Sequence, residues 1–268
     1  MNKSKLIHTM RKSLLILLLI GCMISCDEKE EKSIDPNVVS YPMTVGSQWT
    51  YDRKIIIDHL ESENSDKVVA TDTFKFVVNV WIDKDTVLNG KEVKVFKARE
   101  VGGMHTSCNY YFLDSEGLKT YAYLSGGLNV FAQAGVHLKS ATDKTLLEDN
   151  RIFYENPPTL DVKLPLTAGS RWTYRHSAEN NNSLIDKEVT GGETLKLIGQ
   201  NFDCYKVSFI FNVEPQKSNT LMTEWISDKG LIRRISTHKK VLFTKEDGQT
   251  VGYGRSSETL TLKALEIQ

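Results

Sequence analysis

The chain alternates apolar and polar residues over much of its length, with turn-forming Gly, Pro, Asn and Asp between the apolar runs. Residues 73–81 and 205–211 are rich in β-branched and aromatic side chains, and residues 259–267 alternate almost without interruption. A period of two places every second side chain on one face of a strand. After the first 26 residues no long helical period occurs, and only residues 138–147 have room for a short helix. The pattern predicts an all-β, mainly antiparallel protein.

Three sequence blocks occur twice in the same order. They are residues 41–51 and 164–174, residues 92–97 and 201–206, and residues 112–118 and 225–231. The first pair shares seven of eleven positions, including a Pro, a Gly-Ser pair and the triplet Trp-Thr-Tyr. Conserved order predicts duplication of a whole folding unit. The sequence leaves open whether the copies form separate domains or share one core, and we expect two similar β-sheet units packed together.

The repeated blocks have structural explanations. In the first block Pro fixes φ and Gly permits a positive φ, so the block predicts a turn that leads into a strand. The Trp and Tyr that follow are two positions apart and therefore lie on one strand face, as a seed for the core. Asn89-Gly90 and Asp247-Gly248 each separate two apolar runs, which predicts two β-hairpins.

The first 26 residues have the order of a secretory signal: a basic segment without acids, a short apolar run, then small residues and two cysteines. The apolar run, residues 13–20, is too short to span a bilayer comfortably. A cysteine at the cleavage point resembles the lipobox of bacterial lipoproteins, which implies acylation of that cysteine. Cys22 completes the better lipobox match, but Cys26 directly precedes an acidic run and leaves a polar tether. We favour Cys26 over Cys22; an unlipidated secreted protein and an uncleaved anchor are the alternatives.

Residues 26–31 resemble the acidic segments that follow the lipidated cysteine in Bacteroidetes lipoproteins. The resemblance implies a protein that is anchored by lipid to the outer membrane and exposed at the cell surface, with the periplasmic face as the alternative. A plain solvated linker has the same composition. The expected organisation is a signal peptide (1–26), an acidic tether (27–40), a first β repeat unit with a connecting segment (41–160), and a second β repeat unit with C-terminal strands (161–268).

The first block also resembles the "Y-F-P-L-x-x-G-x-x-W-x-Y" opening of many uncharacterised bacterial secreted proteins and lipoproteins. The closing segment from Trp225 to Arg233 is similar to theirs, and in the first copy Phe112 replaces the Trp. This resemblance implies an extracytoplasmic β-rich domain and supplies no active site. More distantly, a curved sheet with a hairpin at Gly230-Leu231 is similar to the LolA/LolB-like carriers, which hold acyl chains. That similarity concerns the fold and does not transfer function.

Charge narrows the partners that the chain can have. The whole chain has 34 basic and 34 acidic residues, and the signal holds four of the basic ones and no acid. The mature part therefore has 30 basic against 34 acidic residues, a net charge of −4. Phosphate binding needs a concentrated basic surface, so we expect no nucleic-acid partner. We expect attachment to the membrane through the N-terminal lipid, with an envelope protein or a glycan as the further partner.

Motifs for catalysis are missing from the sequence. It has no Gly-x-Ser-x-Gly elbow, no Walker A loop and no dinucleotide fingerprint, and no two histidines after the signal have metal-ligand spacing. We therefore expect no catalytic residue, no metal and no cofactor. The acids that a glycoside hydrolase would need lie in predicted turns, where Asp supports backbone hydrogen bonds. These acids are Asp83, Asp85, Asp114, Glu116 and Asp228.

Four residues are weak candidates for a ligand site. His105 and Cys108 lie in or beside a glycine-rich loop, and Tyr121 and Tyr123 are expected to share one strand face. Cys108 and Cys204 either form a disulfide or remain buried thiols, which is the more frequent fate of such cysteines. The expected function is a non-enzymatic, lipid-anchored binding or scaffold domain. The alternatives are a carrier or sensor of an apolar ligand in a curved-sheet cavity and, third, a hydrolase of envelope polymers.

Overall fold

The computed structural model describes residue 38 and residues 40–124, 151–176, 183–244 and 250–268. All of them belong to the compact unit Ile34–Gln268. The signal peptide with Cys22 and Cys26, the expected short helix at 138–147 and the expected turn at Asp247-Gly248 lie outside the described residues. Within the described ranges, no helix is long and apolar enough to cross a membrane.

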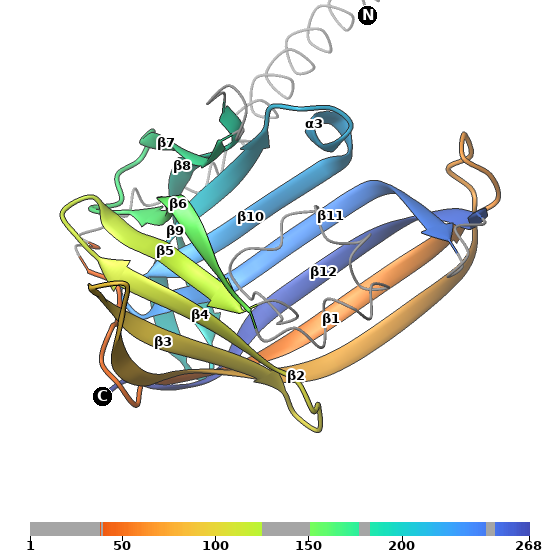
Figure 1. Ribbon diagram of the computed structural model, residues 1–268. Coiled ribbons are helices and arrows are strands. Elements are labelled where there is room, and N and C mark those ends of the chain that lie inside the picture. The colour runs from red at the N-terminus through yellow and green to blue at the C-terminus, as the bar shows by residue number, and fades with distance from the viewer. Residues whose placement is uncertain (1–37, 39, 125–150, 177–182, 245–249) are drawn as a thin grey trace, which may run out of the picture. The chain divides into compact units, whose positions relative to one another are not determined.

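The described residues form twelve strands and one short helix, α3 (Gln216–Asn219). The strands are β1 (Gln48–Leu60), β2 (Val68–Leu88), β3 (Lys91–Glu100), β4 (Thr106–Leu113), β5 (Gly117–Leu124), β6 (Ile152–Lys163), β7 (Arg171–His176), β8 (Ser183–Leu197), β9 (Gln200–Phe211), β10 (Thr220–Ser227), β11 (Gly230–Thr244) and β12 (Thr250–Glu266). Every strand pairing is antiparallel (Figure 1). The prediction of an all-β, antiparallel protein is confirmed.

Both halves of the chain enter one sheet, in the order β6-β5-β4-β3-β2-β1-β12-β11-β10-β9-β8-β7. The ladder between β1 and β12 joins the halves along thirteen positions, from Gln48 opposite Glu266 to Leu60 opposite Tyr253. The main apolar core contains residues of both halves, and a smaller cluster lies between β7, β8, β9 and β10. In place of two packed units, one continuous sheet and one main core span the repeat, because β1 and β12 pair edge to edge.

The repeated sequence blocks adopt the same backbone geometry. In the first copy the Gly46 N–H donates to the Ile82 carbonyl at 2.9 Å, and the Ile82 N–H donates to the Ser47 carbonyl at 3.0 Å. The same two bonds recur in the second copy at 2.8 and 2.9 Å, between Gly169, Val189 and Ser170. Gly46 and Gly169 have φ values of 92° and 77°, in the region that favours glycine. The equivalent halves are therefore β1–β6 and β7–β12.

The β2–β3 hairpin turns at Asn89-Gly90, as the sequence predicts, with φ values of 47° and 78°. Its equivalent in the second half is the β8–β9 turn at Ile198-Gly199, with φ values of 47° and 79°. Two successive positive φ values make the turn that matches the twist of paired strands. Asn adopts this conformation readily, whereas a β-branched residue does so at a cost. The second hairpin therefore keeps the turn of the first with a less suitable residue.

The sheet curls until its two edge strands, β6 and β7, come together (Figure 1). Trp172 Nε1 on β7 donates to the Leu160 carbonyl on β6 at 3.0 Å. Farther along, Arg175 on β7 forms an ion pair with Glu155 on β6 at 2.6 Å. Among the described residues no ladder pair joins β6 to β7. We call this contact the β6–β7 seam; it closes the sheet through side chains.

Candidate functional site

Three charged side chains meet inside the curled sheet. Lys187 on β8, Glu224 on β10 and Arg234 on β11 are all buried, and we call them the ion cluster. Lys187 Nζ lies 3.1 Å from Glu224 Oε2, and Arg234 Nη2 donates to Glu224 Oε1 at 2.8 Å. Isolated charges are costly in an apolar interior, so pairing and hydrogen bonding are what allow these groups to be buried.

Strand register explains how the ion cluster forms. Glu224 lies directly opposite Arg234 in the β10–β11 ladder, where side chains of opposite charge attract each other. The ammonium of Lys187 lies 4.5 Å from the ring centre of Tyr174 and 4.4 Å from that of Phe209. The faces of aromatic rings attract cations, so these two rings support the charge that the carboxylate neutralises.

The ion cluster sets the charge of Glu224. Burial alone would raise the pKa of this carboxyl, but Lys187 and Arg234 together hold it below its usual range. Glu224 is therefore ionised at neutral pH and shared between two cations. A carboxylate in this state stabilises its neighbours and has no proton to give.

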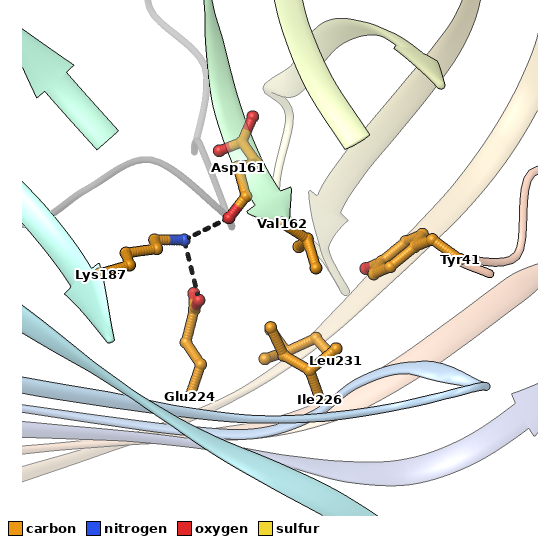
Figure 2. A pocket seen from close by; sticks show the side chains of 7 residues that line it. All are labelled: Tyr41, Asp161, Val162, Lys187, Glu224, Ile226 and Leu231. Carbon is orange, nitrogen blue, oxygen red and sulfur yellow. Dashed lines mark hydrogen bonds and ion pairs between the residues drawn. The ribbon is translucent and has the colours of Figure 1, made fainter. Parts of the chain in front are cut away.

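Asp161 on β6 adjoins the ion cluster and is only 2 % exposed. Figure 2 shows Lys187 Nζ donating to the backbone carbonyl of Asp161, at 2.9 Å, while the Asp161 carboxylate lies on the far side of its backbone. Asp161 Oδ2 accepts a hydrogen bond from Thr120, and Oδ1 has no hydrogen-bond partner among the described residues. Burial raises the pKa of Asp161 to about 6, against the attraction of Lys187. This carboxyl is thus incompletely satisfied when it is charged.

A small buried void of about 10 Å³ lies between β6, β8 and β10, as Figure 2 shows. Its lining residues are Tyr41, Asp161, Val162, Lys187, Glu224, Ile226 and Leu231. Two acids whose pKa values move in opposite directions are a known arrangement for acid–base catalysis. The void, however, has room for about one water molecule. Because no sugar ring or peptide can enter a space of this size, the geometry here supports structural cohesion.

A larger hollow lies at the end of the β2–β3 hairpin and has a volume of about 580 Å³. We call it the hairpin groove; its lining residues are Met43, Asp85, Thr86, Val87, Glu92, Val93, Lys94, Tyr111, Phe112 and Leu113. Val87 is 61 % exposed, and Leu113 is also exposed. The groove combines apolar side chains with both signs of charge, and its volume lies in the range of ligand sites.

The part of β2 that lines the groove is also a free strand edge. The ladder between β1 and β2 ends at the pair Gln48 and Trp81. From Lys84 to Leu88, β2 pairs with β3 on one side and, among the described residues, with no strand on the other. An edge of this kind presents unpaired backbone N–H and C=O groups that can take up another strand.

The structure separates His105 from Cys108 in environment. His105 is exposed in the connection before β4, whereas Cys108 is buried on β4. Burial raises the pKa of the Cys108 thiol. Cys204 is also buried, and burial raises the pKa of its thiol to about 12. Both are free thiols, so the buried-thiol alternative is confirmed and neither has the lowered pKa that a nucleophile needs.

Tyr121 and Tyr123 lie two positions apart on β5 but do not share a face. The register of β5 shifts at Tyr121 against both neighbouring strands. Tyr121 contacts Tyr154 with ring centres 5.6 Å apart, whereas Tyr123 stacks on Phe153 at 5.7 Å. Phe153 and Tyr154 are consecutive residues of β6 and therefore point to opposite faces of the sheet. The two tyrosines that contact them lie on opposite faces as well. A bulge flips the alternation on which the expectation of a shared face rested.

Each of the acids that the sequence places in turns forms an ion pair with a lysine. For Asp83 and Asp85 the expectation of a turn is wrong, because both lie within β2. Asp83 lies 2.9 Å from Lys97, whose hydrogen bond is the largest cause lowering the pKa of Asp83. The remaining ion pairs are Asp85 with Lys94, Asp114 and Glu116 with Lys119, and Asp228 with Lys229. In the part of the chain that the structure describes, no group of three His, Cys, Asp or Glu residues could hold a metal ion.

The ion cluster and Asp161 match no known sequence motif, so a motif search does not find them. A weaker signal exists: Lys187 is flanked two positions away by Ile185 and Val189, and Glu224 by Met222 and Ile226. Alternation predicts an inward side chain at both charged positions. A charge on the predicted core face is the mark that identifies such residues before the structure is known.

Comparisons with known proteins give remote structural likenesses. No family model matches the chain, and no curated protein matches it. A solved structure from Bacteroides fragilis NCTC 9343, named for an exported protein with a YmcC-like fold, is 13% identical over 85% of this chain and 99% of its own, with a TM-score of 0.36. One from Parabacteroides distasonis ATCC 8503, named as a lipoprotein, is 15% identical over 85% and 98% of the two chains, with a TM-score of 0.34. Likenesses at these levels carry no argument about what this chain binds or does.

Proposed function

We propose that the protein is a lipid-anchored, non-enzymatic binding domain of the cell envelope, and that its hairpin groove receives an extended segment of a partner protein. The observation that carries this proposal is that one stretch of β2 both lines a groove of about 580 Å³ and has a free edge. An edge strand offers the main-chain hydrogen bonds, and the side chains around it offer selectivity.

The chemistry of the groove favours a polypeptide over a glycan. Val87 and Leu113 supply exposed apolar contacts, and Asp85, Glu92 and Lys94 supply both signs of charge. A lining with apolar contacts and both signs of charge suits an extended segment that carries apolar and charged side chains. Glycan binding through stacked rings would call for exposed aromatic faces, whereas Tyr111 and Phe112 are buried.

The proposed anchor rests on the first 26 residues. A basic segment, a short apolar run and a cysteine followed by acids are the features of a lipoprotein signal. Several acyl chains on Cys26 hold a protein to a membrane where one chain does not. We expect incorporation of an alkyne-labelled fatty acid in cells to be lost in Cys26→Ala and kept in Cys22→Ala. The reverse result assigns the anchor to Cys22. A wild-type protein that incorporates no fatty acid contradicts the lipid anchor.

Binding through the groove is tested by photo-crosslinking in the native host. A photoreactive amino acid replaces Val87 at the groove and, as a matched control, Val69, which is 58 % exposed on the distal part of β2. We expect the probe at Val87, and not the probe at Val69, to capture one partner protein. That protein must then bind the purified chain, with affinity lowered at least tenfold by Val87→Glu and unchanged by Val69→Glu.

Other outcomes of the same experiment contradict the proposal. Equal capture at both positions indicates non-specific contact, and capture of glycan alone replaces the protein partner by a carbohydrate. No crosslink at Val87 in cells in which the chain is anchored and folded favours the scaffold role.

One observation favours a second candidate, the carrier of an apolar ligand. The sheet curls around its core and is closed at the β6–β7 seam by side chains. A carrier needs a sizeable cavity, however, and the void beside the seam measures about 10 Å³. The carrier function therefore requires a second, opened state of the sheet.

A further inference from the structure

The repeat gives the sheet two equivalent junctions between its halves, and the two are built differently. The end of the second half, β12, meets the start of the first, β1, along thirteen laddered positions. The end of the first half, β6, meets the start of the second, β7, without a ladder among the described residues. Because one junction has a ladder and the other is held by side chains, the β6–β7 seam is the weaker of the two junctions.

The strand β6 has a local reason for failing to pair with β7. Pro157 and Pro158 lie in its middle, and proline has no N–H to donate to a ladder. Among the described residues, the second half bonds to β6 through side chains, and two of these side chains donate to backbone carbonyls of β6. Trp172 Nε1 binds the carbonyl of Leu160 at 3.0 Å, and Lys187 Nζ binds that of Asp161 at 2.9 Å.

We propose that the sheet opens at the β6–β7 seam while the β1–β12 junction stays closed, and that ionisation of Asp161 favours the open state. Among the described residues, opening breaks the contacts of Trp172, Lys187 and Arg175 with β6 and no ladder, and it exposes the void beside Lys187 and the apolar residues around it. The inference is independent of the hairpin groove, which lies on β2, β3 and β4.

Asp161 is placed to control the seam because it lies on β6 itself and is buried only while the seam is closed. Thr120 binds Oδ2 in either form, and Oδ1 has no partner among the described residues. The missing partner costs more when the carboxyl is charged than when it is neutral. The groups that face it from the surrounding elements are Tyr41 before β1, Tyr111 on β4, Thr120 on β5, Tyr174 and Arg175 on β7, Lys187 on β8 and Glu224 on β10. The cations Lys187 and Arg175 offset part of the burial penalty of the carboxylate, and the pKa near 6 is the net result.

The experiment measures how fast buried thiols react when the sheet opens. All four cysteines of the full chain are first replaced by Ala; they are Cys22, Cys26, Cys108 and Cys204. A single thiol is then introduced by Val162→Cys on β6 or by Leu262→Cys on β12. Both positions are almost fully buried, at 4 % and 2 % exposure. Rates with a disulfide reagent are divided by those of free cysteine at the same pH. We expect the thiol of Val162→Cys to react at least tenfold faster than that of Leu262→Cys.

The role of Asp161 adds a pH dependence to the thiol rate at the seam. With pKa values of about 6 when closed and 3.8 when exposed, the opening constant is about tenfold larger at pH 7.5 than at pH 5. We expect the corrected rate of the Val162→Cys thiol to change by about this factor, and to become independent of pH when Asp161→Asn is added. The Leu262→Cys thiol has no such dependence.

The repeat supplies a matched control for the indole hydrogen bond across the seam. Trp172→Phe removes the bond across the seam, and Trp49→Phe removes the indole bond at the equivalent position, to the Lys229 carbonyl at 2.7 Å. We expect only Trp172→Phe to speed labelling of the Val162→Cys thiol relative to the Leu262→Cys thiol. Equal rates at the two thiols in the parent chain mean that only global unfolding exposes them, which overturns the proposal. A faster but pH-independent rate at the seam overturns the role of Asp161.

Discussion

Replacing Asp161 by Asn is expected to stabilise the folded protein at neutral pH. The substitution keeps the shape of the side chain and an oxygen that accepts the hydrogen bond of Thr120. It removes a negative charge that is buried and only partly satisfied. Most substitutions of buried residues destabilise proteins, so a gain in stability at this position would be a specific result.

The magnitude of the gain comes from the two pKa values of Asp161. The value is about 6 in the folded protein, above the ordinary value of 3.8. The folded state thus binds the proton more tightly than the unfolded state, and the contribution of this acid to stability falls as the pH rises from about 4 to 6. At pH 7 the charged carboxylate costs about 3 kcal/mol, since each unit of pKa difference corresponds to about 1.4 kcal/mol. At pH 4 the cost falls to below about 1 kcal/mol because the folded state is almost fully protonated and the unfolded state is partly protonated.

The assay is urea unfolding of the wild type and of Asp161→Asn between pH 4 and pH 8. We expect Asp161→Asn to be more stable by about 3 kcal/mol at pH 7 and nearly equal to the wild type at pH 4. The surface substitution Asp228→Asn serves as the control. We expect it to leave unchanged the difference in the free energy of unfolding between pH 4 and pH 7. An Asp161→Asn chain that is less stable than the wild type at pH 7, or whose gain does not depend on pH, refutes the reasoning.

Three further substitutions test the packing that the structure assigns. Lys187→Met leaves Glu224 with one of its two cations and is expected to cost about 3 to 5 kcal/mol in urea unfolding; a loss below about 1 kcal/mol would mean that the ion cluster does not depend on this lysine. Ile198→Asn gives the β8–β9 turn the residue of the equivalent first hairpin and is expected to raise the free energy of unfolding by about 1 kcal/mol, whereas no gain would show that the positive φ carries no strain. Gly254→Ala places a methyl group 2.6 Å from the ring of Phe243 and from a backbone oxygen, so we expect the melting temperature to fall with a loss of about 1 to 3 kcal/mol, and an unchanged temperature would contradict this close approach.

The local features of the fold follow from the sequence because they depend on short segments. The Pro and Gly of the first block, the Trp and Tyr that lie two positions apart after them, and the turn at Asn89-Gly90 all behave as their local chemistry dictates. The repeat likewise predicts a duplicated geometry, which the equivalent bonds of Gly46 and Gly169 display.

The joining of the two halves could not be derived from the sequence. Whether β1 pairs with β12 or ends its own sheet depends on contacts between residues roughly two hundred positions apart. The sequence signals of an internal strand are the same in both cases. The expectation of two packed units treats each copy as self-sufficient, whereas a repeat unit often cannot bury its apolar face alone.

The candidate site is missed for two different physical reasons. Lys187 and Glu224 look like ordinary exposed charges unless the strand phase is known, and their pairing depends on β8 and β10 meeting inside the sheet. Tyr121 and Tyr123 look like a pair on one face unless the bulge at Tyr121 is known. In both cases register, which the sequence specifies weakly, decides the environment of the side chain.

The most direct test of the proposed binding function is backbone hydrogen exchange of β2 with and without the partner captured at Val87. Strand addition pairs the free edge, so we predict slower exchange of the amides between Lys84 and Leu88 on binding, with no change at the distal end of β2 near Val69. Protection that misses Lys84 to Leu88 while the partner is fully bound would contradict recognition through the hairpin groove.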